Sequence, residues 1–201
     1  MRLLNFATRH PEPGRLETRR TVLQRPQPND FQAWADLRRE SADFLQPFEP
    51  SWAADELSRS AFRARLRRHE ADIASGRGLP WFLFDRHRPD ILLGGITISN
   101  IRHGVAETGT LGYWMGEEHA GKGLMKEALL AVCGELIEVH HLHRIEAATV
   151  LNNERSQALL TRCGFKQEGM ARQYLRINGV WRDHNLFARL AEDQLPADSS
   201  L

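Results

Sequence analysis

The sequence predicts one mixed α/β domain in which helices pack around a single sheet. Helical and β-like patterns follow one another as helix, helix, three strands, helix, strand, helix and two strands. A glycine-rich turn containing Gly121 and Gly123 joins a strand to a long helix, and Asn178-Gly179 separates two β-like runs as a hairpin turn would. The length of 201 residues fits one domain without repeats or linkers.

We expect three regions along the chain. Residues 1–18 form an irregular N-terminal segment, residues 19–191 form the domain, and residues 192–201 form a polar, flexible tail. A short β-prone run at Thr21–Leu23 opens the domain.

Two helices are expected before the sheet. Phe31, Trp34 and Leu37 repeat at helical spacing, and this helix should end before Pro47. The second helix is expected over residues 53–74 and carries a basic run. We interpret this run as a solvated face rather than as a contact with an acidic partner or RNA. Its members are Arg63, Arg65, Arg67 and Arg68.

Three strands and a turn should follow. Residues 81–84 form an aromatic β run, residues 91–99 form the next strand, and residues 85–90 between them read as a turn. Residues 110–115 form the third strand.

The second half of the domain should alternate helices and strands. A long amphipathic helix is expected over 121–139, a strand over 144–151, and a short helix over 153–162 that Gly164 closes. The hairpin around residues 178–179 completes the sheet.

Charge and cysteine usage exclude several classes of protein. The 27 basic and 26 acidic residues nearly cancel, so we expect no direct nucleic-acid binding and no membrane attraction. No apolar run approaches the roughly 20 residues that cross a bilayer. Cys133 and Cys163 lie in apolar segments and are interpreted as reduced packing residues, which favours the cytoplasm.

The turn before the long helix has the features of an anion site. Gly121 and Gly123 remove side chains where a ligand would approach the backbone. The first N–H groups of the helix point outward, and the helix dipole adds positive potential suited to a pyrophosphate. Lys122 adds a cation. The Walker pattern G-x-x-x-x-G-K-[S/T] is absent.

Several blocks together carry a resemblance to a known family. They are L-Q-P-F-E-P at 45–50, G-Y-W at 112–114, A-G-K-G-L-M at 120–125, H-R-I-E-A at 143–147, N-E-R-S at 153–156 and R-C-G-F-K-Q-E-G at 162–169. The chain resembles the GNAT acyltransferases from about residue 21 to residue 190. Within them it is most similar to the RimJ/RimL type, which acetylates N-terminal amines of ribosomal proteins.

The resemblance implies a particular sheet. It should be mixed and largely antiparallel, flanked by helices, with two parallel central strands, 110–115 and 144–151, that splay apart. The pantetheine arm of acetyl-coenzyme A would lie in this gap and pair with backbone near Trp114 and Met115. The acceptor amine would enter from the opposite face, near the first two helices and the final hairpin.

Acetyl-coenzyme A is the implied co-substrate, with no metal. The residues implied for its binding are Tyr113, Trp114, Met115, Ala120, Gly121, Lys122, Gly123, Leu124, Met125, Asn153 and Ser156. The loop departs from the family pattern because Ala120 stands where Gln or Arg is usual. Binding through backbone N–H groups would survive this change, although it would weaken.

The sequence identifies the catalytic residues less clearly than the coenzyme-binding residues. The family's general-acid Tyr is replaced by Leu160, which leaves Ser156 as the proton or hydrogen-bond donor to the departing thiolate. An α-amine has a pKa of about 8, so about a tenth is neutral at pH 7 and only a modest base is needed. The candidate bases are Glu117 and Glu118, and His119 and Glu168 are further candidates.

Two other groups of residues invite a functional interpretation. His140, His141 and His143 lie across a helix end, which scatters their rings, and we favour packing roles over a metal site. The five tryptophans fit a core, although Trp52 is equally suited to shape the acceptor pocket.

The leading hypothesis is acetyl transfer from acetyl-coenzyme A to the N-terminal α-amine of a protein, with ribosomal proteins as candidates. One alternative is a small-molecule acceptor, a polyamine or an amino-sugar. Another is a non-catalytic acyl-coenzyme A-binding protein. The sequence is compatible with a monomer or a homodimer.

Overall fold

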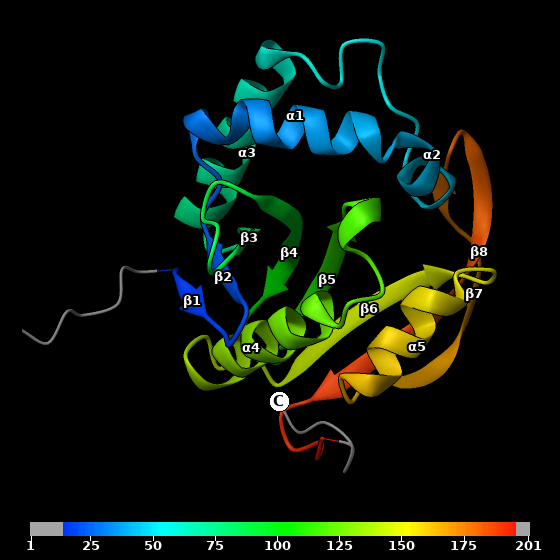
Figure 1. Cartoon of the computed structure of the whole chain (residues 1–201). Helices are drawn as coiled ribbons and strands as arrows, with labels where there is room; N and C mark the ends of the chain where they lie inside the picture. Colours follow the sequence, from blue (N-terminus) through cyan, green and yellow to red (C-terminus); the bar gives the residue numbers. More distant parts are fainter. Residues whose placement is uncertain (1–13, 196–201) are drawn as a thin grey trace, which may run out of the picture.

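A computed structural model of the chain describes residues 14–195 (Figure 1). Most of the segment 1–18 and the end of the tail 192–201 therefore lie outside the described residues. Within residues 14–18, which were expected to be irregular, two residues have regular structure. Leu16–Glu17 forms a short strand, β1, that pairs antiparallel with β2 (Thr21–Gln24), and β2 in turn pairs with β3. β2 coincides with the β-prone run expected at Thr21–Leu23, whereas β1 was not expected.

The sheet has eight strands in the order β1-β2-β3-β4-β5-β6-β8-β7. Beyond β1 and β2, its strands are β3 (Leu79–Asp85), β4 (Leu92–Arg102), β5 (Thr108–Met115), β6 (Arg144–Val150), β7 (Lys166–Ile177) and β8 (Val180–Leu190). All neighbours are antiparallel except β5 and β6. The expected mixed, largely antiparallel sheet is thus confirmed.

Helices cover both faces of this sheet (Figure 1). On one face lie α1 (Phe31–Glu40), α2 (Ala42–Leu45) and α3 (Arg59–Ala74), and on the other lie α4 (Leu124–Glu138) and α5 (Glu154–Arg162). Single 3-10 turns occur at Pro28–Asp30, Gln46–Phe48 and Glu117–His119. Each face has its own apolar core, one beneath α4 and α5 and a smaller one, rich in aromatic rings, beneath α1 and α3.

The first helical region ends before Pro47 as expected, whereas the second helix begins later than expected. The first helix breaks at Ser41, whose buried hydroxyl accepts a hydrogen bond from the N–H of Glu117 at 2.9 Å. The second begins at Arg59 rather than at residue 53, because the side chain of Ser58 caps it by accepting the N–H of Ala61 at 3.1 Å.

The basic run on α3 is only partly a solvated face. Arg63, Arg67 and Arg68 are exposed. Arg65, however, pairs with Glu56 at 2.5 Å and lies over the Trp34 ring, so it belongs to the packing of this face.

The expected packing role of the cysteines is confirmed. Cys133 and Cys163 are free and completely buried. Burial raises the pKa of Cys133 to about 11, so the thiol stays protonated at neutral pH. The tryptophans are less uniform, since Trp34 and Trp81 are buried but Trp181 is 58% exposed on β8.

The central parallel strands part soon after they meet. β5 and β6 pair at only three positions, Thr108 with Arg144, Gly109 with Ile145 and Thr110 with Glu146. Beyond Thr110, β5 continues to pair with β4 as far as Met115, while β6 continues to pair with β8. A gap therefore opens between β5 and β6, where the splay was expected. Within residues 14–195, no helix is long and apolar enough to cross a membrane.

The start of α5, beside this gap, depends on one capping side chain. Asn153 accepts a hydrogen bond from the N–H of Ser156 at 3.1 Å. We expect Asn153→Ala to lower the free energy of unfolding by about 1 kcal/mol, since a capping residue contributes about this much. Urea unfolding followed by fluorescence measures the change. Asn152→Ala, at the exposed neighbouring position, serves as the control, and an equal loss in both variants would contradict the capping role.

Candidate active site

The backbone of β5 presents polar groups to the gap. The N–H of Gly116 donates to the carbonyl oxygen of Leu93 on β4 at 2.9 Å. Because N–H groups of successive residues in a strand point to opposite sides, those of Tyr113 and Met115 face away from β4 and towards β6. β6 no longer pairs at this level, so these groups are left for a ligand.

The loop after β5 ends in the predicted anion site. Gly121 and Gly123 both have φ of 76°, a left-handed conformation that favours glycine, and Gly123 occupies the N-cap position of α4. A Cβ added at Gly121 would meet no atom within 4 Å, so space is open beside the backbone. The first turn of a helix leaves its N–H groups without helical partners, and here the turn begins at Leu124.

The other residues expected in this loop have different surroundings. Lys122 is exposed, whereas Met125 is buried and Ala120 packs against the core beneath α4. Trp114 faces the opposite side of the sheet, where its indole Nε1 would lie 2.6 Å from a Cβ at Gly95. Gly94 and Gly95 of β4 therefore make room for Trp114 and the strand that carries it.

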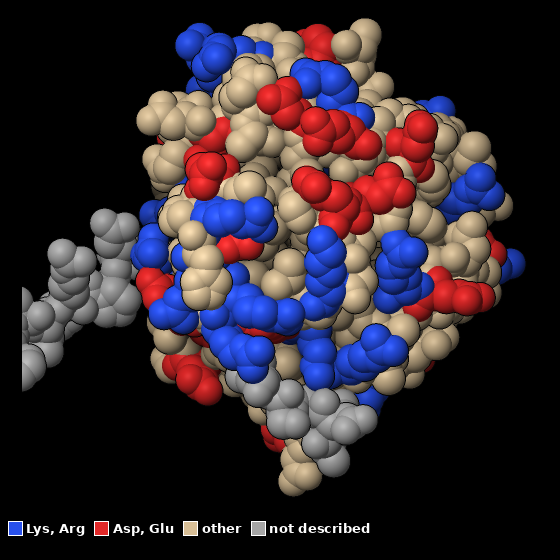
Figure 2. All heavy atoms as spheres, viewed as in Figure 1, with Lys and Arg blue, Asp and Glu red and all other residues tan. Residues whose placement is uncertain are grey.

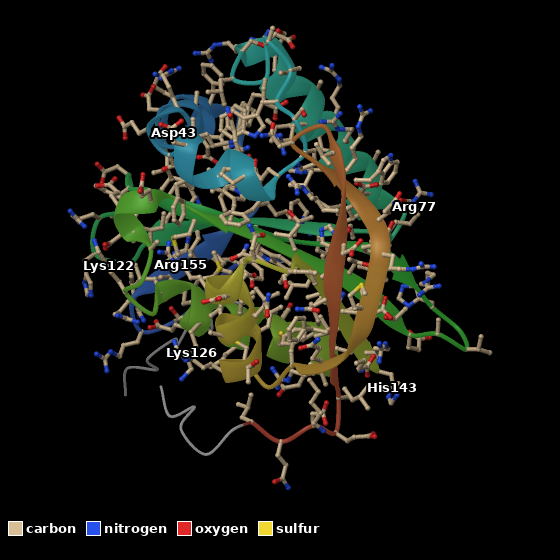
Figure 3. All side chains as sticks on the ribbon, turned by 90° about the vertical axis from the view of Figure 1, so that its right-hand side faces the viewer. Asp43, Arg77, Lys122, Lys126, His143 and Arg155 are labelled. Carbon is tan, nitrogen blue, oxygen red and sulfur yellow. The ribbon has the colours of Figure 1, made fainter. Side chains whose placement is uncertain are left out.

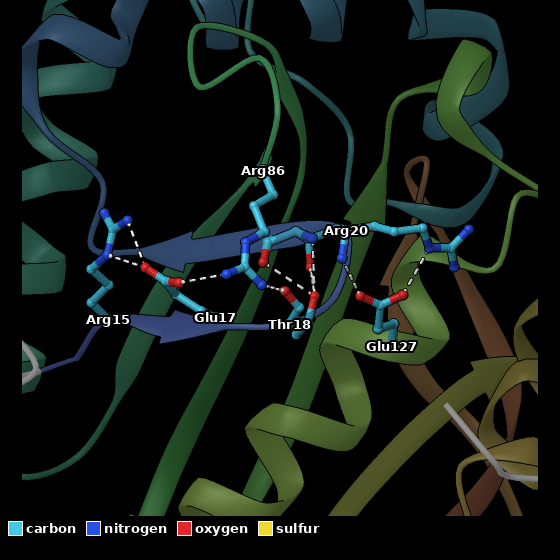
Figure 4. Close-up of polar contacts among 7 residues, drawn as sticks. Arg15, Glu17, Thr18, Arg20, Arg86 and Glu127 are labelled. Carbon is cyan, nitrogen blue, oxygen red and sulfur yellow. Dashed lines mark hydrogen bonds and ion pairs between the residues drawn. The ribbon is translucent and has the colours of Figure 1, made fainter.

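An ion pair between Arg20 and Glu127, called the brace below, stabilises the end of this loop (Figure 4). Glu127 on the first turns of α4 accepts hydrogen bonds from the backbone N–H of Arg20 at 2.6 Å and from its Nε at 2.8 Å. The Nη1 of Arg20 donates to the carbonyl oxygen of Lys122 at 3.0 Å. Sequence analysis missed this brace, because 107 residues separate Arg20 from Glu127 and neither lies in a recognisable motif.

The brace is charged at neutral pH. Burial alone would raise the pKa of Glu127, but hydrogen bonds from Thr18 and Arg20 outweigh burial and lower it. The carboxylate therefore stays ionised well into the acidic range.

Tyr113 and Ser156 join β5 to α5 beside the gap. The Tyr113 hydroxyl lies 2.6 Å from Ser156 Oγ, a hydrogen bond in which either oxygen is a possible donor. Burial raises the pKa of the Tyr113 phenol, so it remains protonated at neutral pH. The predicted donor Ser156 therefore has a partner that the sequence did not suggest.

Charge is divided across the face that holds the loop. In Figure 2, Lys and Arg side chains gather over the beginnings of α4 and α5, and Asp and Glu side chains gather above them. Figure 3 shows Lys122, Lys126 and Arg155 on the lower part of this side and Asp43 above them. Anionic and cationic ligands would thus be favoured on different parts of one face.

The structure separates the candidate bases. Glu117 and Glu118 are exposed in the turn that follows β5, close to the gap. His119 is buried, and burial lowers the pKa of its ring, so the imidazole is neutral at pH 7. Glu168 pairs with Arg144 at 2.5 Å, at the beginning of β6 where the strands are still joined, so it lies at the wrong end of the gap.

The histidines near the end of α4 do not assemble into a metal site. His140 Nε2 lies 3.9 Å from Glu135 Oε1. Over residues 14–195, no group of three or more His, Cys, Asp or Glu residues is placed to hold a metal ion.

Comparison with known proteins agrees with this geometry. The family described as "Acetyltransferase (GNAT) domain" matches residues 20–166. The chain is 37% identical over 182 residues to the [Ribosomal protein uS5]-alanine N-acetyltransferase of Escherichia coli (strain K12). The alignment covers 90% of this chain and 93% of that protein.

Solved structures show the same fold. Mycobacterium smegmatis RimJ in complex with CoA-disulfide superposes with a TM-score of 0.82 at 30% identity, covering 89% of this chain and 87% of that one. The ribosomal-protein-S5-alanine acetyltransferase from Vibrio fischeri also superposes with a TM-score of 0.82, at 27% identity, covering 90% and 99%.

These findings define the class of protein. A sheet split between parallel strands, a glycine-rich turn at the start of the next helix and these relatives together describe an acetyltransferase. The chain belongs to the GNAT acetyltransferase family, which confirms the resemblance seen in the sequence.

We expect Glu127→Gln to loosen the anion loop, because the brace to Arg20 loses its charge. The free energy of unfolding should fall by about 2 kcal/mol, as for a hydrogen bond to a charged group, and the Kd for coenzyme A should rise. Calorimetric titration and urea unfolding measure the two effects. Glu138→Gln, an exposed position on the same helix, should change neither.

This charge also sets a pH dependence. Because the folded-state pKa of Glu127 lies below its ordinary value of 4.5, its stabilisation is complete above that value. It is then lost as the pH falls through the lower folded-state pKa. The difference in stability between the wild type and Glu127→Gln should shrink over this acidic window. A constant difference down to the lowest pH would contradict the brace.

Proposed function

We propose that this protein transfers an acetyl group from acetyl-coenzyme A to the N-terminal α-amine of a protein. The carrying observation is that the backbone of Tyr113 and Met115 faces the gap between β5 and β6, and that a glycine-rich turn and the start of α4 follow on the same segment. The pantetheine arm would add to the open edge of β5, and the pyrophosphate would lie on the loop.

In this proposal the loop binds through its backbone. The N–H groups from Gly121 to Met125 face the phosphates, assisted by the dipole of α4. Ala120 lacks the basic side chain usual in the family, and exposed Lys122 and Arg155 supply positive charge nearby. Asn153 at the start of α5 borders the pantetheine path.

The reaction itself would depend mostly on positioning. A neutral amine attacks the thioester carbon, and the N–H of Met115 holds the oxyanion that develops. The C–S bond then breaks, and its electron pair stays on sulfur. The Tyr113 hydroxyl lies within hydrogen-bond distance of Ser156 Oγ. With Tyr113 as the donor of this bond, the Ser156 hydroxyl proton would be directed to the departing sulfur.

An α-amine suits this site better than a lysine side chain. Its pKa of about 8 leaves a useful neutral fraction at pH 7, whereas the lysine pKa of about 10.4 leaves very little. Glu117 and Glu118 are exposed in the turn after β5, and exposed Asp43 lies above Lys122 and Arg155 in Figure 3. These carboxylates would attract a cationic protein segment. Glu117 or Glu118 would take the released proton. A relative named for alanine acetylation of ribosomal protein uS5 supports a ribosomal acceptor.

Mass spectrometry of a single reaction tests the acceptor class. Purified protein and acetyl-coenzyme A are mixed with basic peptides that begin with Ala or Ser, with the same peptides blocked at the N-terminus, and with polyamines. We expect acetylation of the free α-amine only. Acetylation of polyamines alone would overturn the acceptor, and coenzyme A binding without any transfer would overturn the enzymatic function.

We expect Ser156→Ala to lower kcat about three- to tenfold, with Tyr113→Phe giving a smaller loss. The effect is modest because a thiol pKa near 8.5 makes thiolate a good leaving group that needs little help. Steady-state kinetics on the Ala-starting peptide measures both changes. Thr161→Ala removes an exposed hydroxyl from the same helix and should leave kcat unchanged. A full-rate Ser156→Ala enzyme would remove Ser156 from the mechanism.

A further inference from the structure

A buried arginine lies on the face of the sheet opposite α4 and α5. Arg38 of α1 is only 5% exposed. Its guanidinium carbon is 4.4 Å from the centre of the Trp52 ring, 5.1 Å from that of Trp114 and 5.8 Å from that of Trp34. One cation is thus in contact with three aromatic side chains from α1, β5 and the segment after α2.

Arg38 holds Trp52 through a shared carboxylate. Its Nη1 and Nη2 donate to Glu49 Oε1 at 3.2 Å and Oε2 at 2.5 Å. Trp52 Nε1 donates to the same Oε2 at 2.8 Å. A planar guanidinium fits such a paired contact, which a lysine ammonium does not reproduce.

Glu49 also contacts the last hairpin, through its backbone. The carbonyl oxygen of Glu49 accepts the N–H of Asn178 at 2.8 Å, at the turn between β7 and β8. Figure 1 shows this hairpin reaching α2. Arg38 therefore lies where α1, the segment after α2, β5 and the hairpin converge.

This cluster is adjacent to the reacting end of the site. Trp114 immediately precedes Met115, whose N–H faces the gap. Its ring points to the α1 face of the sheet, so the Arg38 cluster and the coenzyme-binding loop lie on opposite faces.

Stability alone is a weak reason for this arrangement. A buried ion pair seldom stabilises a protein more than apolar residues of the same volume would. In addition, Arg38 Nε is buried without a hydrogen-bond partner among the described residues, which costs free energy. Geometric control of the two tryptophans is a role that an apolar replacement would not fill.

We propose that Arg38 is a positioning residue for the acceptor. Through Glu49 it fixes Trp52, and by direct contact it fixes Trp114, so that the two rings form a wall against which the acceptor's first residue lies. Glu49 is already engaged by Arg38 and Trp52, so it offers no free charge to a second ammonium group. This inference rests on the proposed function.

The test compares Arg38→Lys with Arg39→Lys. The first keeps the charge but loses the paired contact with Glu49, whereas Arg39 is exposed and pairs with Asp36 at the surface. We expect Arg38→Lys to raise the KM for an Ala-starting peptide roughly tenfold or more. The KM for acetyl-coenzyme A should stay within about twofold, and Arg39→Lys should match the wild type.

A second variant, Trp52→Phe, tests the same role in case Arg38→Lys does not fold. Trp52→Phe keeps an aromatic ring but removes the N–H that reaches Glu49, at a position that is only partly buried. We expect a several-fold rise in the KM for the peptide with the affinity for coenzyme A unchanged.

The outcomes separate this inference from the proposed function. Parallel changes in both KM values, or reduced thermal stability with unchanged kinetics, would overturn the positioning role while the function stands. A wild-type protein that binds coenzyme A but acetylates no peptide would overturn the proposed function, and this inference with it.

Discussion

The early end of pairing between β5 and β6 is the constraint on which the rest of the site depends. Only Thr108, Gly109 and Thr110 of β5 pair with β6. Beyond them the backbone of Tyr113 and Met115 faces a gap instead of a strand. Unpaired backbone groups away from water are unfavourable, so a ligand that adds to this edge would gain hydrogen bonds that the fold leaves open. The helices α4 and α5 begin beside the same gap.

Two charge pairs connect distant parts of the chain around this gap, one on each side of the sheet. Arg20 and Glu127 connect the segment before β2 to the beginning of α4, beneath the glycine-rich loop. Arg38 and Glu49 connect α1 to the segment after α2 on the opposite face. Both pairs join parts of the chain that secondary structure alone does not hold together. In the proposed function, the first serves the coenzyme and the second serves the acceptor.

Local patterns predicted much of this fold, because their causes are local. The helix over α4, the Asn153 start of α5 and the Asn178-Gly179 turn each rest on a few neighbouring residues. Asn178 and Gly179 have φ of 42° and 78°, as a two-residue hairpin turn with positive φ requires. The split sheet was predicted from family resemblance, since no local pattern indicates where two distant strands stop pairing.

The features that the sequence did not indicate depend on contacts between distant residues. The break between α1 and α2 lies at Ser41, whose hydroxyl accepts a hydrogen bond from the N–H of Glu117, 76 residues away. Glu168 was a reasonable base in sequence, but its pairing with Arg144 places it at the joined end of β5 and β6. Arg20 gave no signal at all, because its role depends on Glu127 and on a carbonyl group of the loop.

Amide hydrogen exchange with and without coenzyme A tests the central claim most directly. If the coenzyme adds to the open edge of β5, saturation with it should slow exchange at Tyr113 and Met115 and at the N–H groups that begin α4. Exchange at the β1–β2 edge of the sheet should stay unchanged. Saturation without any slowing at Met115 would contradict the account, because the gap between β5 and β6 would then not be the coenzyme site.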